Sequence, residues 1–321
     1  SLYITAAPDA GEEEIGIVTL SAFKNDTNTM FWQFTYFATV GNKPPIIEEV
    51  KPPIHTFDGK LLFSTVVKDL GAGIENVRLF LLINEEFCDV PMNWQQGDTF
   101  NSTLYTAKIP QVPNNSQIYY VIGATDWLGE QTFSDEYAAF VNYDISAKNV
   151  TPCKTVAGQG LSCNISATFM NEGTVTEELL NVAVYANTTL IHVQTVPLLT
   201  NGASTTVTFT WNTTGFTKGN YTITSYAVPV HGEADTTDNT LTDGWIIVAM
   251  IGDITGPDGY PDGKCDMRDV GAVARRFGIT PAHPLWDSNC DITGDVIGLP
   301  DEKIDMRDIG TVARNFGKTD P

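Results

Sequence analysis

The chain has 321 residues, of which 42% are apolar, and its formal net charge of −21 gives a pI near 4.3. This length allows two or three domains, and the apolar content excludes a wholly disordered chain. The negative charge argues against nucleic acid or anionic membrane surfaces as partners, and no apolar run of about 18 residues predicts a membrane span. Composition therefore favours a soluble protein in a cation-rich extracellular setting.

Residues 1–43 predict an N-terminal β segment. The strand-like runs "EIGIVTLSAF" and "TMFWQFTYFATV" flank "KNDTNT", and the second run carries apolar residues on both faces. Two strands alone are marginal in water, and a ribbon of this kind requires burial. Three partners remain open: the first sandwich, the end of an upstream module, or an open sheet edge on a second copy. We favour the last, which would add strands head to tail and build a filament.

Residues 44–143 predict a first β-sandwich. Pro44 and Pro45 interrupt the preceding strand, and short runs of period two, separated by turn residues, follow them. The stretches "VVKDLGAGIENVRLFLLIN" and "YYVIGATDWLGE" resemble the fibronectin/Ig-like modules of microbial surface proteins. The resemblance implies a spacer or adhesion fold without implying an activity.

Residues 144–249 predict a second Ig-like sandwich. The stretches "ATFMNEGTVTEE" and "EADTTDNTLT" resemble the CARDB-type, adhesion-related domains of archaeal and bacterial exported proteins. Glu233, Asp235 and Asp238 either bind a cation or form a solvated acidic turn before the last strand, and we favour the turn.

Residues 250–321 contain a duplication. The run "DGKCDMRDVGAVARRFG" from Asp262 to Gly278 returns as "DEKIDMRDIGTVARNFG" from Asp301 to Gly317. Each copy joins an acidic loop to a short helix. Calcium takes six to eight oxygen ligands, so we favour cation binding over acids that only solvate the surface.

The EF-hand template places ligands at positions 1, 3, 5, 7, 9 and 12, with position 7 using its backbone carbonyl. In the first loop the predicted ligands are Asp253, Thr255, Asp262, Lys264 (carbonyl), Asp266 and Asp269. In the second loop they are Asp291, Thr293, Asp301, Lys303 (carbonyl), Asp305 and Asp308. The insertions "GPDGYP" and "GDVIGLP" separate positions 3 and 5, so Asp258 or Asp295 could compete as ligands. Glu302 replaces the glycine expected at position 6, which predicts backbone strain.

An aspartate at position 12 followed by such a helix resembles the dockerin type of half EF-hand. The resemblance implies two bound calcium ions, two antiparallel loop–helix units and a possible cohesin-like partner. The residues predicted to form a narrow apolar face on the two helices are Val270, Val273, Ala274 and Phe277, and Ile309, Val312, Ala313 and Phe316. Two short helices can bury these faces on each other, with metal adding stability that the small core lacks.

Several signals favour secretion or a cell-surface location. Eight sequons are candidate glycosylation sites, at Asn25, Asn101, Asn114, Asn149, Asn164, Asn187, Asn212 and Asn220. An oxidising compartment would pair Cys153 with Cys163 and Cys265 with Cys290, leaving Cys88 unpaired, although free thiols remain the alternative. No leader precedes the first strand, so we expect any signal peptide to have been removed.

No catalytic motif stands out. The histidines at 55, 192, 231 and 283 form no metal-ligand pattern, and nucleophile-elbow and phosphate-loop motifs are missing. The number of Asp and Glu residues does not exclude a glycosidase-like pair of catalytic carboxylates. We disfavour such a pair because small β-sandwiches seldom leave a cleft.

Two functions therefore compete. The favoured one is a non-catalytic structural or adhesive subunit of an archaeal surface or filament that binds itself or another surface protein. The alternative is the non-catalytic tail of a secreted hydrolase that docks onto a cohesin-bearing scaffold.

Overall fold

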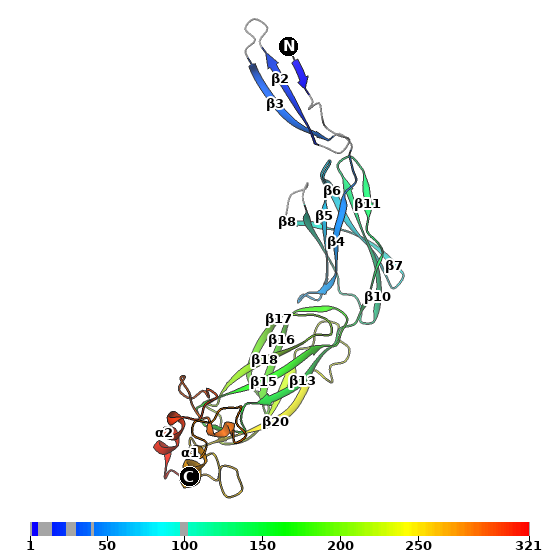
Figure 1. Cartoon of the computed structure of the whole chain (residues 1–321). Coiled ribbons are helices and arrows are strands. Elements are labelled where there is room, and N and C mark those ends of the chain that lie inside the picture. The colour runs from blue at the N-terminus through cyan, green and yellow to red at the C-terminus, as the bar shows by residue number, and fades with distance from the viewer. Residues whose placement is uncertain (1, 6–14, 24–29, 40–41, 97–101, 321) are drawn as a thin grey trace. The chain divides into compact units, whose positions relative to one another are not determined.

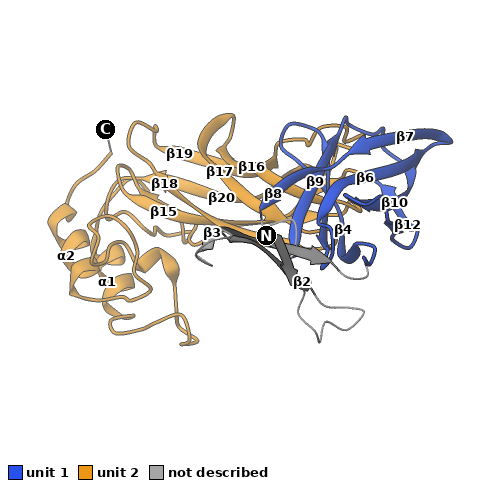
Figure 2. Ribbon diagram, turned by 90° about the horizontal axis from the view of Figure 1, so that it is seen from above, with its two compact units in different colours: residues 1–142 blue, residues 143–321 orange. Residues whose placement is uncertain are grey.

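The computed structural model describes the following residues: 2–5, 15–23, 30–39, 42–96 and 102–320. The first three segments are described as backbone only. The chain divides into two compact units, which Figure 2 shows in separate colours: residues 1–142 and 143–321. Strands dominate both units, and the helices α1 and α2 come last in the chain (Figure 1). The predicted mainly β fold with a short helical C-terminal region is confirmed.

The N-terminal strands form a small antiparallel sheet in the order β1-β2-β3. They are β1 (Leu2–Thr5), β2 (Ile15–Phe23) and β3 (Met30–Thr39). The register pairs Leu20 with Phe34. Their side chains lie outside the described part of the structure, so the burial of both faces stays a prediction.

Two further sheets of the first unit form a β-sandwich. One has the order β11-β10-β6-β7, with β12 also on β10, and its strands are β6 (Ile74–Ile83), β7 (Glu86–Pro91), β10 (Ser116–Asp126), β11 (Gln131–Phe133) and β12 (Tyr137–Val141). The other has the order β4-β5-β9-β8, and its strands are β4 (Ile46–His55), β5 (Leu61–Lys68), β8 (Asn93–Gln96) and β9 (Thr103–Ile109). Alternate residues of β5 are buried, as the period of a strand requires. Phe63 of β5 meets Tyr120 of β10 with ring centroids 5.1 Å apart, so the two sheets share one core.

The second unit contains another two-sheet sandwich. Its smaller sheet, β13-β15-β18, consists of β13 (Ile145–Pro152), β15 (Ser162–Asn171) and β18 (Ser204–Asn212). Its larger sheet runs β14-β20-β19-β16-β17 and consists of β14 (Val156–Gly158), β16 (Thr176–Ala186), β17 (Thr189–Leu199), β19 (Gly219–Ala227) and β20 (Thr240–Ala249). The core centres on Trp211, which lies edge-on to Phe216 and Tyr221 at 5.0 and 5.5 Å. Both sequence-predicted sandwiches are therefore present.

Two short helices and one 3-10 turn follow the second sandwich: α1 (Met267–Ala274), η1 (Ser288–Cys290) and α2 (Met306–Asn315). Each α-helix begins with a capping box formed by two aspartates, Asp266 with Asp269 and Asp305 with Asp308. No helix in the described part of the chain is long and apolar enough to cross a membrane.

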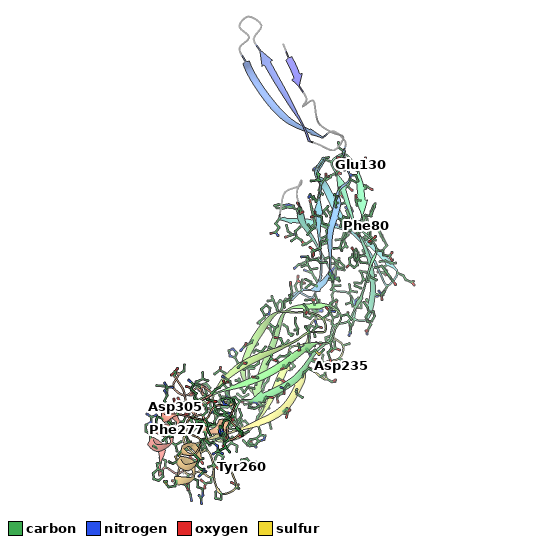
Figure 3. The ribbon with its side chains drawn as sticks, in the orientation of Figure 1. Phe80, Glu130, Asp235, Tyr260, Phe277 and Asp305 are labelled. Atoms are coloured by element: carbon green, nitrogen blue, oxygen red, sulfur yellow. The ribbon has the colours of Figure 1, made fainter. Side chains whose placement is uncertain are left out.

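The apolar helix face differs from the prediction. Val273 and Val312 are fully buried as expected, but four other predicted members are exposed: Ala274, Phe277, Ala313 and Phe316. Figure 3 labels Phe277, which is 54% exposed because α1 has already ended at Ala274. The buried row of each helix instead runs one position earlier, through the capping aspartate and the residue three positions after it, Ala272 or Thr311.

The C-terminal residues share a core with the sandwich. One cluster of buried residues joins Val156 and Ala249 of the sandwich to Ile254, Val273 and Val312 of the C-terminal region. The expected domain boundary near residue 249 is therefore not a division of this structure, because the hydrophobic contacts continue across it.

The two predicted disulfides are not formed. Cys153, Cys163, Cys265 and Cys290 are all free thiols, as is the exposed Cys88. The thiol of Cys265 donates to the carbonyl oxygen of Gly252 at 3.3 Å, and burial raises its pKa to about 11. Buried cysteines of this kind pack as small apolar residues.

Candidate metal centres

The first predicted loop is closed by two buried aspartates. Asp253 accepts hydrogen bonds from the backbone N–H groups of Asp262 and Gly263, at 3.2 and 2.8 Å. Asp269 accepts three more, from the N–H groups of Ile254, Thr255 and Asp266 at 2.8, 3.0 and 2.8 Å. The loop is thus fastened at its beginning and its end, and positions 1, 3, 5, 9 and 12 of the template are brought together.

The second loop has the same hydrogen-bond pattern. Asp291 accepts from the N–H groups of Asp301 and Glu302 at 3.2 and 2.8 Å. Asp308 accepts from those of Ile292, Thr293 and Asp305, at 2.6, 3.0 and 2.7 Å. Corresponding residues of the two loops form the same hydrogen bonds, although the two insertions differ in length.

The insertions fold out as small turns. Gly259 N donates to Gly256 O at 3.1 Å in the first loop, and Gly294 N donates to Leu299 O at 2.8 Å in the second. A Cβ atom on Gly294 would lie 2.2 Å from the Cβ atom of Asp301, so only glycine fits where the chain returns. Each insertion therefore adds residues without moving position 5 away from position 1.

The competing acids in the insertions are engaged elsewhere. The carboxylate of Asp258 accepts from Tyr260 N at 3.3 Å inside its own turn. Asp295 is 84% exposed in its side chain and forms a 2.6 Å ion pair with Arg307. Neither carboxylate is hydrogen-bonded to Asp253 or Asp291, the aspartates that begin the loops.

The donor atoms fit a hard cation. A carboxylate offers about four lone-pair sites, so Asp253 and Asp269 retain acceptor capacity beyond the N–H groups that they bind. In the second loop, Asp301 Oδ1 is inaccessible to solvent and has no hydrogen-bond partner. Carboxylates, a hydroxyl and a backbone carbonyl are the oxygen ligands that calcium prefers, and the structure provides these residue types in both loops.

Burial makes it costly to ionise the aspartates that begin the two loops. It raises the pKa of Asp253 and of Asp291 to about 6 each, against the hydrogen bonds that lower it. The charges of Asp269 and Asp262 raise the pKa of Asp253 further. A divalent cation would remove this penalty, because it attracts the carboxylates that repel one another.

Glu302 is strained in the way that the sequence predicts. Its φ angle is 64°, in the left-handed region, where Gly263 of the first loop has a φ angle of 82°. The conformation lets Glu302 N reach Asp291 at 2.8 Å. Loop geometry at this position therefore overrides the preference of a side chain that carries a Cβ atom.

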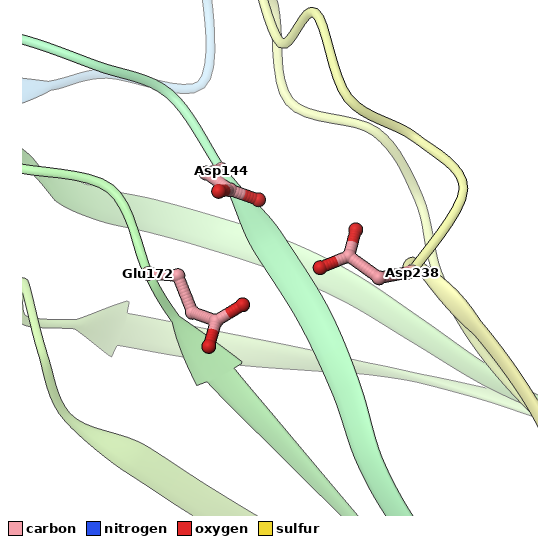
Figure 4. Close-up of side chains that lie close together, drawn as sticks. All are labelled: Asp144, Glu172 and Asp238. Carbon is pink, nitrogen blue, oxygen red and sulfur yellow. The ribbon is translucent and has the colours of Figure 1, made fainter.

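A separate acidic group lies in the second sandwich. Asp144, Glu172 and Asp238 point toward one another (Figure 4), with one ligand oxygen from each within 4.8 Å of the others. This is the one such group of three or more His, Cys, Asp or Glu residues in the described part of the chain, so neither C-terminal loop gathers three carboxylates that closely. Asp144 Oδ1 and Asp238 Oδ1 are inaccessible and have no hydrogen-bond partner.

Charge in this group is only partly balanced. Burial, and then the neighbouring acids, raise the pKa of Asp144 and of Asp238. Glu172 pairs with Lys148 at 2.6 Å, and this hydrogen bond lowers the pKa of Glu172. The arrangement is a possible acidic metal site within the second sandwich.

Glu233 and Asp235 belong to a turn, as favoured from the sequence, and they are not part of the acidic group that contains Asp238. Glu233 accepts from the N–H groups of Ile145 and Val230, at 2.6 and 2.9 Å, and so fastens a turn to β13. Asp235 accepts from Thr237 within its own turn. The partners of Asp238 are Asp144, just before β13, and Glu172, just after β15. They are distant in the sequence, so no local pattern reveals them.

Six of the eight sequons lie in the described part of the chain with their side chains. Four of these asparagines are exposed: Asn149, Asn187, Asn212 and Asn220. Asn114 and Asn164 are partly exposed, while Asn25 and Asn101 lie outside the described residues. Glycosylation stays a prediction.

Comparison with known families identifies one module. Residues 144–243 match the CARDB family. The predicted resemblance of the second sandwich to CARDB domains is thereby confirmed, and the dockerin-like resemblance of residues 250–321 stays a prediction. No curated protein matches the chain.

Three solved structures are similar to parts of the chain. The CARDB domain of a Pyrococcus furiosus protein, in complex with di-metal ions, is 23% identical over 33% of this chain and 89% of that one, with a TM-score of 0.28. A domain of a predicted cell-surface protein from Methanosarcina acetivorans is 28% identical over 33% and 91%, with a TM-score of 0.28. The FN1–FN3 domains of chicken CNTN1 are 13% identical over 73% and 77%, with a TM-score of 0.31.

The buried aspartates predict that, without divalent cations, the second unit loses stability as the pH rises. Their folded pKa values of about 6 lie above the 3.8 of an ordinary aspartate. A raised folded pKa adds stability that is complete below the unfolded pKa and is lost as the pH rises through the folded value. Urea unfolding of the second unit in chelator should therefore show a loss of roughly 1–3 kcal/mol per residue between pH 4 and 7. A variant with Asp253→Asn and Asp291→Asn should lose this slope, and an unchanged slope would contradict the assignment.

The strained glutamate predicts a stabilising substitution. Glu302→Gly should raise the free energy of unfolding by about 0.5–1 kcal/mol, because glycine adopts a positive φ angle without a Cβ penalty. Chemical denaturation of both forms in calcium measures the change. Gly263→Glu is the matched control and should destabilise the chain. Equal stability of wild type and Glu302→Gly would show that the loop carries no strain at this position.

Proposed function

We propose that the chain is a non-catalytic structural or adhesive part of a cell surface, in which calcium at two C-terminal loops stabilises the second unit. The observation that carries this proposal is the repeated hydrogen-bond pattern of Asp253 with Asp269 and of Asp291 with Asp308. Calcium would supply positive charge and oxygen coordination there. The protein supplies buried carboxylates that are already fastened at both ends of each loop.

The CARDB match over residues 144–243 supports a structural or adhesive role, since the stretches that resemble CARDB-type, adhesion-related domains lie within it. The net charge of −21 supports a setting rich in cations. Extracellular modules work with calcium dissociation constants of roughly 10⁻⁴–10⁻³ M, which such a setting can saturate.

The shared core favours this proposal over the docking of a hydrolase to a scaffold. Val156 and Ala249 of the sandwich pack in one cluster with Val273 and Val312 of the helices. A C-terminal region held in this way already has a partner within its own chain. Its loops are positioned to stabilise the sandwich end, whereas a free-standing docking module would hang from a linker.

Self-assembly is the second element of the proposal. We propose that the N-terminal sheet of one copy adds to a sheet of the next, because three strands whose register pairs apolar positions such as Leu20 with Phe34 are marginal alone. A head-to-tail contact of this kind does not close and generates a filament.

Calcium should raise the melting temperature of the second unit in the full chain and leave the first unit nearly unchanged. Binding to the folded form alone adds RT ln(1 + [L]/Kd), about 2.7 kcal/mol at a hundredfold excess over Kd. Differential scanning calorimetry with calcium or with chelator measures the shift. Asp269→Ala and Asp308→Ala should each remove the contribution of one loop.

Asp258→Ala is the matched control, because this acid lies in the first loop but outside the hydrogen-bond pattern. It should leave the calcium shift unchanged. Identical melting curves with calcium and with chelator would overturn the proposal. The Asp269→Ala/Asp308→Ala double variant could still bind one calcium ion. If adding Asp144→Asn to it abolished that binding, a further cation would be placed at the acidic group of the sandwich.

Deletion of residues 1–41 should abolish assembly and leave soluble monomers with both sandwiches folded. The missing sheet removes the strands that join neighbouring copies. Electron microscopy and light scattering of the full and shortened chains, with circular dichroism as the folding check, measure the outcome. Fibres formed by the shortened chain would show that the assembly contacts lie elsewhere.

A further inference from the structure

A row of three phenyl rings lies on the outer face of one sheet of the first sandwich. In β6, Leu79 and Leu81 are buried in the core, so Phe80 between them points outward. Its ring centroid, on a residue labelled in Figure 3, lies 6.4 Å from that of Phe87 in β7 and 6.0 Å from that of Phe133 in β11. Phe87 and Phe133 are 68% and 56% exposed. Exposed apolar surface of this extent marks an interaction site.

Part of the row covers a glycine in the middle of β10. A Cβ atom at Gly123 would lie 2.8 Å from Cε2 of Phe80 and 2.9 Å from Cε1 of Phe133, so both rings rest on the backbone of β10. Glycine weakens the interior of a strand, and covering it accounts for these two rings. It does not account for Phe87, because β7 lies on the side of β6 that faces away from β10.

Two clefts lie beside the row, and Phe80 lines both of them. The first, of about 370 Å³, is mainly apolar, and its other lining residues include Leu82, Phe87, Tyr119 and Val121. The second, of about 450 Å³, is mainly polar, and its other lining residues include Glu75, Asn76, Arg78, Thr125 and Gln131. Apolar and aromatic walls with a few polar groups are the usual composition of a small-ligand site.

The polar side chains of the second cleft have hydrogen-bonding capacity to spare. In the part of the chain that the structure describes, the side chains of Asn76, Thr125 and Gln131 make no hydrogen bond. Arg78 is oriented by a hydrogen bond from its Nε to Asp89 at 2.7 Å, and its guanidinium group carries further N–H donors. Donors and acceptors are therefore presented beside the aromatic row.

This combination suits a neutral saccharide. One face of a sugar ring presents C–H groups that pack on the negative face of an aromatic ring, while its hydroxyl groups donate and accept hydrogen bonds. An acidic polymer is disfavoured, because the chain has a net charge of −21 and Glu75 and Glu136 line the two clefts. A strand added from another chain would pair with the edge of a sheet, whereas the row lies on its face.

We propose that the outer face of the β11-β10-β6-β7 sheet binds a neutral oligosaccharide, whose rings stack on Phe87, Phe80 and Phe133 and whose hydroxyl groups bind Asn76 and Gln131. This inference rests on the proposed adhesive role and names a ligand class for it. The site involves no residue of the calcium loops.

Solid-phase binding of the full chain to immobilised polysaccharides tests the proposal. The probes are a neutral glucan, a neutral mannan, a neutral galactan and, as the acidic comparison, polygalacturonate. The chain should bind at least one neutral polymer and bind polygalacturonate more weakly than that polymer. Binding should persist in chelator, because the aromatic row belongs to the first sandwich.

Two variants address the residues of the site. Phe87→Ala should weaken binding to the neutral polymer about tenfold, because it removes one stacking ring. Gln131→Ala should weaken it roughly threefold to tenfold, as expected for one hydrogen bond. Both residues are exposed, so circular dichroism and the melting temperature of the first unit should stay unchanged.

Phe57→Ala is the matched control. It removes a ring that is 67% exposed from the turn between β4 and β5, away from both clefts. Its polysaccharide binding should equal that of the wild type.

The outcomes separate this inference from the proposed function. Absence of binding to all three neutral polymers, or equal losses in Phe87→Ala and Phe57→Ala, would overturn the inference. Loss of self-association in Phe87→Ala without any polysaccharide binding would overturn it too, because the row would then contact a second copy of the chain. Such failures leave the calcium shift of the second unit intact, whereas failure of calcium binding leaves the polysaccharide assay unaffected.

Discussion

Hydrogen bonds from backbone N–H groups to four buried aspartates organise the C-terminal region of this chain. Asp269 and Asp308 complete the capping boxes of their helices by accepting from the N-cap backbone, and they also accept from N–H groups at the start of their own loops. The same side chains therefore position the helix, close the loop and present carboxylate oxygen to a cation. This multiple use explains why a short stretch with a small core keeps such dense negative charge: each aspartate contributes hydrogen bonds to the fold as well as oxygen atoms to the candidate site.

The buried aspartates also account for the way in which the C-terminal region joins the sandwich. Once each capping aspartate faces inward, the neighbouring positions Ala272, Val273 and Val312 face inward with it. Their cluster reaches Val156 and Ala249 at the end of the sandwich. The helices are too short to be stable alone, and this common core supplies burial that two isolated loop–helix units would lack. The boundary that the sequence suggests near residue 249 is thus bridged by hydrophobic contacts in the folded chain.

Local patterns predicted the strands, both sandwiches and the acidic loops, because period-two alternation and the spacing of Asp262 to Asp269 are properties of contiguous residues. They failed where the outcome depends on packing between distant segments. Phe277 and Phe316 continue an apolar helical pattern, yet they are exposed because each lies beyond the last residue of its helix, Ala274 or Asn315. The acidic group of Asp144, Glu172 and Asp238 was missed since its members come from three separate parts of the chain.

The internal duplication meets the sandwich asymmetrically. Both loops keep the same contacts between aspartates and backbone, so the differences between them arise outside the repeat. The second loop receives a hydrogen bond from Lys154 of the sandwich at the carbonyl oxygen of Asp291, whereas the first loop continues directly from β20. Fusion of a duplicated module to a β-sandwich therefore gives two similar loops different surroundings while their own hydrogen bonds remain the same.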